Sequence, residues 1–188
     1  MYDKCSILRA ITGLTLFNMS FDWYKFYPKE VNKTIDVTEY SSVMNVLEHS
    51  LEKWGDKTAY INMGKSFTFK EVDALSKQFA AYLQNDCGIK KGDRIAIQMP
   101  NCLQYPIIMF GAIRAGAIVV NTNPLYTPSE MEHQFKDSGA KVVIVLANFA
   151  ANLQKIINNT KIEKVIITKL GDMLGFKGHI VNFVVKSI

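Results

Sequence analysis

The segment KVVIVLANFAANLQKIINNTKIEKVIIT, residues 141–168, decides the fold. Its first part, 141–146, is a nearly continuous apolar run, which is what a strand buried on both faces of a sheet requires. A helical segment is predicted to follow at 148–158, and a second strand at 164–168. A strand, a helix and another strand in succession are typical of a parallel sheet with right-handed crossovers.

Two more helices are predicted upstream of this segment. One is expected to be capped by Asn101 and to run to Arg114, with Pro106 weakening or bending its early turns. The other opens with Thr127-Pro-Ser-Glu130, a capping box with proline in the first helical position, where it is best tolerated.

Strands are also predicted at 94–98 and 118–121, so strands and helices alternate from residue 94 to residue 168. We therefore expect an α/β fold in three layers, built on a mostly parallel sheet of at least four strands.

Three regions are expected along the chain: an N-terminal extension at 1–20, an aromatic arm with a first helix at 21–57, and the α/β unit at 58–188. Within that unit a hairpin is predicted at 58–68, and a helix opened by the capping box Thr68-Phe-Lys-Glu71 follows it. The side chains expected to form the buried stripe of this helix are Val72, Leu75, Phe79, Tyr82 and Leu83.

The composition argues against several classes of partner. The 188 residues carry 22 Lys and Arg against 17 Asp and Glu, but the basic residues are scattered, so no nucleic acid partner is expected. Three cysteines without metal-knuckle spacing indicate free thiols in a reducing compartment. His133 lies beside Glu130 and Glu132 without a second histidine one helical turn away, so no metal site is expected.

Ligands of an open parallel sheet bind outside the carboxyl ends of its strands. Those ends are predicted at 99–101, 121–127 and 147–148. Each leads into a helix N-terminus, whose amides could meet an anionic or polar ligand. The alternative is that Asn101, Thr127 and Asn148 serve only as helix caps.

The chain lacks the usual nucleotide-binding and nucleophile motifs. Residues 88–92 (GIKKG) contain glycine and lysine, but they run into a strand rather than from a strand into a helix, which is the wrong order for a phosphate loop. Neither Gly-x-Gly-x-x-Gly nor Gly-x-Ser-x-Gly occurs. Arg114 is explained by its place in a last helical turn, where a cation stabilises the helix dipole. No catalytic, cofactor-binding or metal-ligating residue is therefore predicted.

Several runs of sequence nevertheless resemble one family. They are 99–106 (MPNCLQYP), 110–128 (FGAIRAGAIVVNTNPLYTP) and 132–139 (EHQFKDSG), with further matches at 59–64, 67–72 (FTFKEV), 113–119 (IRAGAIV) and 181–186. In order and spacing these resemble the bacterial long-chain fatty-acid–CoA ligases of the AMP-forming adenylating superfamily, whose first two core motifs are similar to 67–72 and 113–119. Because members of that family begin close to Met19–Trp23, residues 1–18 are expected to be an extension and Met19 an alternative start.

The resemblance implies a two-step reaction that uses ATP, Mg²⁺ and coenzyme A. A fatty-acid carboxylate attacks the α-phosphate of ATP to form an acyl-adenylate, and the coenzyme A thiol then displaces AMP. The family motifs that hold the nucleotide lie downstream of the segment matched here, so the resemblance assigns this chain scaffold rather than catalytic residues. By loop position only, Asn123 and Tyr126 are expected near the substrate groove.

The sequence is compatible with three functions. The first is an N-terminal ligase fragment, inactive alone, because the apolar helical pattern near His179 stops at Ile188 without a cap. The second is half of a split ligase that docks with the missing remainder through an exposed apolar patch and an unpaired sheet edge. The third is a non-catalytic acyl- or membrane-binding module, motivated by the aromatic arm and the C-terminal helix. The expected location is cytoplasmic, with peripheral contact at the inner face of the membrane as an alternative.

Overall fold

The computed structural model describes residues 22–186. The expected extension at 1–20, with Met19 as alternative start, lies outside the described residues, and so does the terminal Ile188. The chain divides into two compact units, Met1–Ser41 and Ser42–Ile188. The domain boundaries expected after residues 20 and 57 remain predictions.

The described part of the first unit contains one short helix. The 3-10 helix η1 (Asp22–Phe26) carries Trp23 and Tyr24, whose rings meet edge to face with centroids 6.1 Å apart. Tyr24 also meets Tyr27 in the same manner at 5.5 Å. Tyr24 thus contacts both Trp23 and Tyr27 within the arm.

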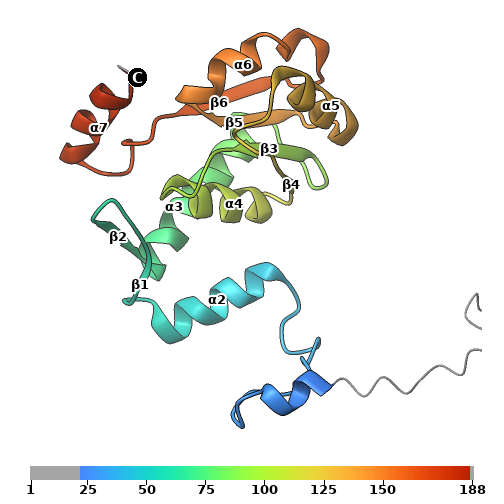
Figure 1. Ribbon diagram of the computed structural model, residues 1–188, viewed down its shortest axis with the longest axis vertical. Coiled ribbons are helices and arrows are strands. Elements are labelled where there is room, and N and C mark those ends of the chain that lie inside the picture. The colour runs from blue at the N-terminus through green and yellow to red at the C-terminus, as the bar shows by residue number, and fades with distance from the viewer. Residues whose placement is uncertain (1–21, 187–188) are drawn as a thin grey trace, which may run out of the picture. The chain divides into compact units, whose positions relative to one another are not determined.

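Four parallel strands form the centre of the second unit (Figure 1). In chain order they are β3 (Arg94–Gln98), β4 (Ile118–Asn121), β5 (Val142–Leu146) and β6 (Lys164–Thr168), and in space the order is β4-β3-β5-β6. β3 is paired on both sides, because Ile97 aligns with Asn121 of β4 and with Ile144 of β5. The predicted parallel sheet of at least four strands is confirmed.

Helices cover both faces of this sheet, which confirms the three predicted layers (Figure 1). On one face, Ile95 and Ile97 pack with residues of α3 (Phe69–Asn85) and α4 (Gln104–Arg114). On the other, Ala96 packs with residues of α5 (Pro128–Ser138) and α6 (Ala150–Gln154). Successive residues of a strand point to opposite faces, so every position of β5 is buried.

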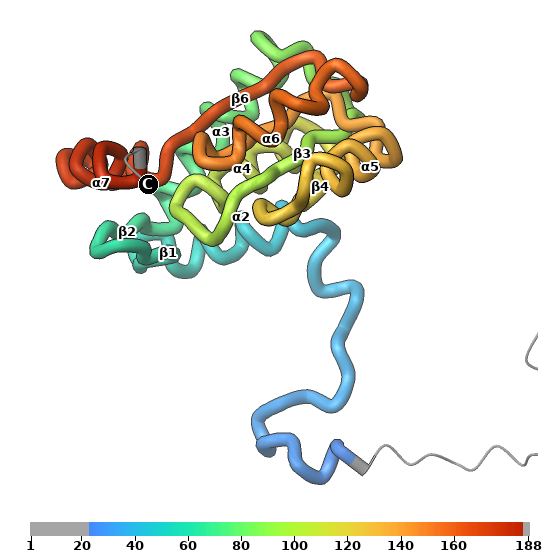
Figure 2. Tube along the Cα trace, turned by 45° about the horizontal axis from the view of Figure 1, so that its top comes forward, coloured from blue at the N-terminus to red at the C-terminus, as the bar shows by residue number. Residues whose placement is uncertain are grey.

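A hairpin and four helical segments complete the second unit. They are α2 (Val43–Trp54), the hairpin strands β1 (Thr58–Asn62) and β2 (Lys65–Thr68), the 3-10 helices η2 (Ala147–Phe149) and η3 (Ile157–Asn159), and α7 (Phe176–Lys186). Met63 and Gly64 both have positive φ, as the predicted two-residue hairpin turn requires. Leu174 and Val181, near and within α7, pack with Phe67 of β2, so the hairpin and the C-terminal helix lie side by side (Figure 2).

The predicted helix caps are confirmed for two helices and wrong for a third. Both capping boxes form, since the hydroxyls of Thr68 and Thr127 accept hydrogen bonds from the third helical residue of α3 and α5. Asn101 does not cap α4, which begins at Gln104 after Leu103 without a side-chain cap. As a result, Pro106 falls in the first turn, where its missing amide hydrogen is not needed.

The segment predicted as one helix at 148–158 is interrupted. The structure has η2, the five-residue α6 and η3 there instead, and Asn148 lies inside η2 rather than at a cap. Phe149 and Ile156 both pack on the sheet, and the short turns let this crossover follow the sheet closely. The C-terminal helix begins at Phe176, slightly before the expected position near His179.

α3 is rotated from the predicted orientation. Val72 and Leu83 are buried as expected, but Tyr82 is 42% exposed and Leu75 and Phe79 are only half-buried. The other buried residues of this helix are Asp73, Ser76 and Ala80. Their small or polar side chains were not expected inside.

Small residues explain this rotation, because they allow α3 and α4 to approach closely. A Cβ atom built on Gly111 of α4 would lie 2.8 Å from Cδ1 of Phe79 and 3.0 Å from the backbone oxygen of Ser76. Only glycine fits at that position without a shift of the neighbouring helix. The close approach of the two helices therefore depends on Gly111.

An ion pair fixes the same interface. Arg114 donates from Nη2 to Oδ1 of Asp73 at 2.5 Å and from Nε to Oγ of Ser76 at 3.2 Å. The side chains of Asp73 and Arg114 are 12% and 13% exposed, so water screens the pair weakly. The presence of Arg114 at the end of α4 is thus explained by its carboxylate partner on α3 and not by the helix dipole alone.

Replacing Gly111 by valine is expected to destabilise the protein by about 2 kcal/mol, because the new side chain overpacks a contact that has no free space. Urea unfolding followed by circular dichroism measures the change. The matched control is Ala74→Val on the exposed face of α3, where only the difference in helix propensity, about 0.5 kcal/mol, should be lost. Equal effects of the two substitutions would contradict the close packing of α3 and α4.

Replacing Asp73 by alanine is expected to cost about 3 kcal/mol of unfolding free energy, since it leaves the Arg114 guanidinium buried without a carboxylate. The double variant Asp73→Leu with Arg114→Met should recover most of that loss, because no buried charge remains. Lys136→Ala, which removes the more exposed pair with Glu132, should cost at most about 0.5 kcal/mol. Chemical denaturation of the four proteins tests this order, and an Asp73→Ala variant as stable as Lys136→Ala would rule it out.

Candidate functional site

The carboxyl ends of the parallel strands all lie at one edge of the sheet, and the loop between β4 and α5 belongs to this edge. Its residues 122–127 connect the last position of β4 with the N-cap of α5. This loop holds both residues that the sequence nominated for substrate contact, Asn123 and Tyr126.

Side chains from three neighbouring elements hold the loop in place. Gln98, the last residue of β3, donates from Nε2 to the backbone oxygen of Asn123 at 3.4 Å. At the base of the loop, Asn121 receives hydrogen bonds from Tyr105 of α4 and from Gln134 of α5. These O–O and N–O distances are 2.9 and 3.1 Å, so the loop is tied to both helix layers.

Asn123 uses its side-chain oxygen within the loop. Its Oδ1 accepts a hydrogen bond from the backbone amide of Leu125 at 3.0 Å, which closes an Asx turn. The backbone oxygen of Asn123 also accepts from the amide of Tyr126 at 3.2 Å. The residue therefore shapes the loop, and a role in substrate contact stays a prediction.

Tyr126 is half-buried and packs against the cluster that contains Met131 and Phe135 of α5. It also lines a shallow polar pocket on the outer side of that helix, together with Ser129, Glu130, His133, Gln134 and Asp137. Within the pocket, the pKa of Glu130 is lowered because the amide and the hydroxyl of Thr127 donate hydrogen bonds to its carboxylate. Asn123 and Tyr126 thus share one loop but serve different local roles.

Buried amide and hydroxyl groups at this edge were missed by sequence reasoning. Gln98, Gln104 and Thr122 are all nearly or fully buried. Among the described residues, Oε1 of Gln98, Oε1 of Gln104 and Oγ1 of Thr122 have no hydrogen-bond partner. A glutamine that ends an apolar strand, as Gln98 does after RIAI, is the signal that could have pointed to them.

An apolar groove lies beside this edge, between α3 and β6. It encloses about 340 Å³. Its lining residues are Leu75, Gln78, Phe79 and Tyr82 of α3, Gln104, Ile107 and Ile108 of α4, Ile144 of β5, Ile166 and Thr168 of β6, and Met173. The groove is mostly apolar, in contrast to the pocket beside Tyr126.

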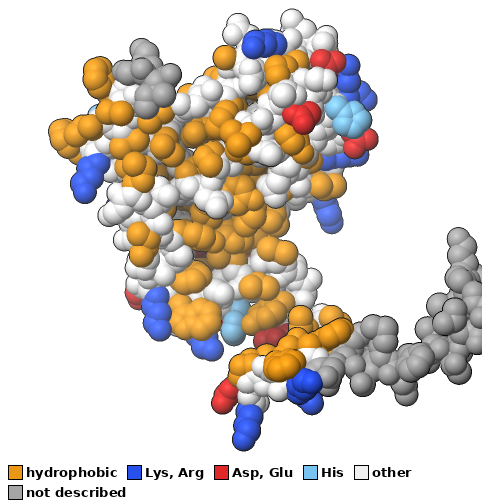
Figure 3. Space-filling model, viewed as in Figure 1, with side chains coloured by type: hydrophobic (Ala, Val, Ile, Leu, Met, Phe, Trp, Pro, Cys, Tyr) orange, Lys and Arg blue, Asp and Glu red, His pale blue; other side chains and the backbone are white. Residues whose placement is uncertain are grey.

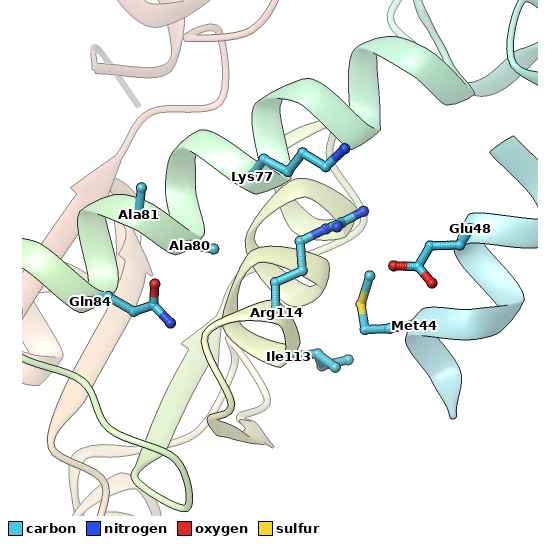
Figure 4. Close-up of a pocket in the computed structure, with 8 residues that line it drawn as sticks. All are labelled: Met44, Glu48, Lys77, Ala80, Ala81, Gln84, Ile113 and Arg114. Carbon is cyan, nitrogen blue, oxygen red and sulfur yellow. The ribbon is translucent and has the colours of Figure 1, made fainter. Parts of the chain in front are cut away.

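A second polar depression lies where α2, α3 and α4 meet (Figure 4). Glu48 and Met44 of α2 face Lys77 of α3 and Arg114 of α4 across it. Both cations are bound to Asp73, because Lys77 lies 2.7 Å from Oδ2 and Arg114 binds Oδ1. Asp73 thus engages both cations, Lys77 within α3 and Arg114 from α4, so we assign the depression no ligand.

The glycine-lysine loop at 88–92 does not form a phosphate site. Its amides are used internally: that of Lys90 donates to Oδ2 of Asp93 at 3.0 Å, and that of Gly92 donates to the oxygen of Gly116 at 2.8 Å. Lys141 holds the pKa of Asp93 below its usual value through an ion pair of 2.7 Å. The loop is a structural connection that enters β3.

Over residues 22–186, no group of three or more His, Cys, Asp or Glu side chains is placed to hold a metal ion. Cys87 and Cys102 are free thiols. No helix in that part of the chain combines the length and the apolarity needed to cross a bilayer.

Comparison with known proteins gives a consistent result. Residues 47–179 match the family model of the AMP-binding enzymes. A long-chain-fatty-acid–CoA ligase of Salmonella typhimurium is 49% identical over 167 residues, which are 88% of this chain and 30% of the relative. A ligase of the same name from Bacillus subtilis is 34% identical over 84% of the chain and 28% of its own length. The chain thus spans about 30% of the length of the curated relatives it matches.

Solved structures agree with the sequence relatives. The anthranilate CoA ligase AuaEII, determined with anthranoyl-AMP, superposes with a TM-score of 0.65 at 26% identity, over 69% of this chain and 25% of that one. The N-terminal domain of a Mycobacterium tuberculosis protein, FACL13, gives a TM-score of 0.61 at 27% identity, over 71% and 34%. The fold, the sequence identity and the family match agree, and the chain belongs to the family of AMP-binding enzymes.

Proposed function

We propose that this chain is the N-terminal scaffold of a long-chain fatty-acid–CoA ligase and that it supplies no nucleotide-binding or catalytic group of its own. The observation that carries the proposal is the 49% identity to such a ligase over 88% of the chain. The loop at 88–92, in which the amides of Lys90 and Gly92 are bound within the fold, supports the second half of it. ATP, Mg²⁺ and coenzyme A would then be bound by the remainder of the enzyme.

Within such an enzyme, the carboxyl edge of the sheet is the surface that a fatty-acid substrate would approach. The loop at 122–127 is bound by Gln98 and follows Asn121, which Tyr105 and Gln134 bind, so it can present Asn123 in a defined position. A contact between this loop and substrate is therefore part of the proposal.

The partner implied by this function is the polypeptide that makes up the rest of the ligase, joined in one chain or docked as a separate one. The location that fits is the cytoplasm, where fatty acid, ATP and coenzyme A are available to a ligase.

One observation favours a second candidate function, peripheral binding to a membrane. α7 exposes a row of apolar side chains, among them Phe176 and Phe183, which are 85% and 74% exposed. Apolar atoms gather over this helix at the upper left of Figure 3. Lys177 lies on the same helix, as expected of a segment that lies in the interface of an anionic bilayer.

The purified chain is expected to form no acyl-CoA above background when it is given ATP, Mg²⁺, a long-chain fatty acid and coenzyme A. The reason is that the chain spans only about 30% of the length of the relatives that are named as ligases, and the nucleotide-binding groups are proposed to lie in the remainder. Consumption of the coenzyme A thiol measures the reaction, with the full-length Salmonella typhimurium ligase as positive control. Turnover that scales with the concentration of this chain would refute the proposal that the scaffold lacks catalytic groups.

If α7 binds membranes, the chain should sediment with vesicles that contain anionic lipid. The double variant Phe176→Ser with Phe183→Ser should reduce the bound fraction, because burial of these rings in the interface would be lost. Ile61→Ser, at an exposed position of β1, is the control for a general loss of surface apolarity. Sedimentation that is the same with and without vesicles would remove this candidate function.

A further inference from the structure

The C-terminal helix α7 buries little apolar surface. Val181 packs with the cluster of Phe67 and Leu174 but is itself only half-buried. The apolar side chains of α7 that are more than half exposed are Phe176, Ile180, Phe183 and Val184. A helix of 11 residues is marginal in water by itself, so contacts other than apolar burial are needed to keep α7 folded on the α/β unit.

A polar clamp joins α7 to the turn that follows β6. Oδ1 of Asn182 accepts a hydrogen bond from the amide of Gly171 at 2.8 Å, and Nδ2 of Asn182 donates to Oδ1 of Asp172 at 3.1 Å. The other carboxylate oxygen of Asp172 accepts from the amide of Lys169 at 2.8 Å and from the hydroxyl of Thr168 at 3.1 Å. These four hydrogen bonds, which we call the α7 clamp, connect the helix with the last residue of β6.

The turn end of the clamp is held from inside the fold. Gln104 of α4 is 2% exposed, and its Nε2 donates to the backbone oxygen of Lys169 at 2.7 Å and to Oγ1 of Thr168 at 3.4 Å. The turn is therefore bound to the body of the unit by a buried amide. Asn182, by contrast, is only half-buried. The turn is thus the fixed side of the clamp, and α7 is the side that can separate from it.

Two buried glycines bring the turn and the helix into backbone contact. A Cβ atom built on Gly171 or on Gly178 would overlap the backbone carbonyl of the other residue. A contact between two glycines buries no apolar side chain, so it fixes the approach of α7 without adding much apolar burial. Gly175 lies between them with φ of 62°, a conformation that glycine adopts without strain.

We propose that α7 opens from the α/β unit in a local cooperative step, without unfolding of the sheet, and that the α7 clamp sets how often it opens. Elements with few buried apolar contacts are the ones that open locally in native proteins. Opening would expose more of the cluster of Phe67 and Leu174, against which Val181 packs. The clamp thereby controls the exposure of an apolar surface beside the hairpin, whether or not the chain serves as a ligase scaffold.

Asn182→Asp tests the clamp, because it sets a second carboxylate against that of Asp172 and removes the hydrogen bond between them. Hydrogen exchange of the 188-residue chain, followed by mass spectrometry, reports each segment separately. We expect the amides of α7 to exchange at least about tenfold faster, while those of β3 and β5 keep their rates. Unchanged exchange in α7, or an equal acceleration in β5, would overturn the inference.

Exchanging the two side chains should restore the clamp. In the double variant Asp172→Asn with Asn182→Asp, the oxygen of the introduced amide can accept from Thr168 and Lys169, and its nitrogen can donate to the introduced carboxylate. Exchange of α7 should then return to within about threefold of the original rate, since the two changes compensate. Exchange as fast as in Asn182→Asp alone would count against the clamp.

Asn159→Asp is the matched control. The amide of Asn159 also donates to a carboxylate, that of Glu132 at 3.2 Å, but it lies outside α7. The added charge and the lost hydrogen bond are therefore the same, and the exchange of α7 should not change. Faster exchange of α7 in this control would mean that the effect is not specific to the clamp, which would also overturn the inference.

A measurement on the unmodified chain applies even if Asn182→Asp fails to fold. Exchange at increasing urea concentrations below the unfolding transition separates local opening from global unfolding. The amides of α7 should exchange at urea concentrations at which those of β5 are still protected. Equal protection of the two segments at every urea concentration would show that α7 opens only when the whole unit unfolds, contrary to the inference.

Discussion

Burial of a parallel sheet on both faces is the constraint on which the second unit depends. β5 satisfies it completely, since all five of its residues are buried between the α3–α4 layer and the α5–α6 layer. β6, at the edge of the same sheet, satisfies it only in part. The contrast between these two neighbouring strands accounts for the closed core at one side of the unit and the apolar groove at the other.

Close packing of α3 on α4 is the means by which one of these faces is closed. Gly111 allows the helices to approach, and the buried pair of Asp73 with Arg114 fixes how they are aligned. The two features act together, because a buried pair is favourable only where its geometry is well held. The helix that carries Arg114 also carries Tyr105 and Gln104, which reach the loop after β4 and the end of β6. The packing of α3 on α4 therefore helps to position the side chains of α4 that lie at the carboxyl ends of the strands.

Much of the fold could be predicted from sequence, because local signals agreed with it. The apolar run at 142–146, the Met63-Gly64 turn and the boxes at Thr68 and Thr127 each specify their structure within a few residues. The buried face of α3 could not be predicted in the same way. Asp73 and Ser76 are polar, and their burial depends on Arg114 and Gly111, which lie far along the chain. The Asx turn of Asn123 with Leu125 is local, but it was not predicted, and the part of Asn123 and Tyr126 in substrate contact remains a prediction.

The strand order β4-β3-β5-β6 has a consequence for how the protein is made. β3 is synthesised first and becomes a central strand, and each later strand is added beside one that has already left the ribosome. The sheet can thus assemble stepwise during translation, as N-terminal domains commonly do. In a full-length relative, the open side of β6 would then stay uncovered until the following part of the polypeptide has been synthesised. During that interval the nascent chain would expose an unpaired strand, which is the state that chaperones protect.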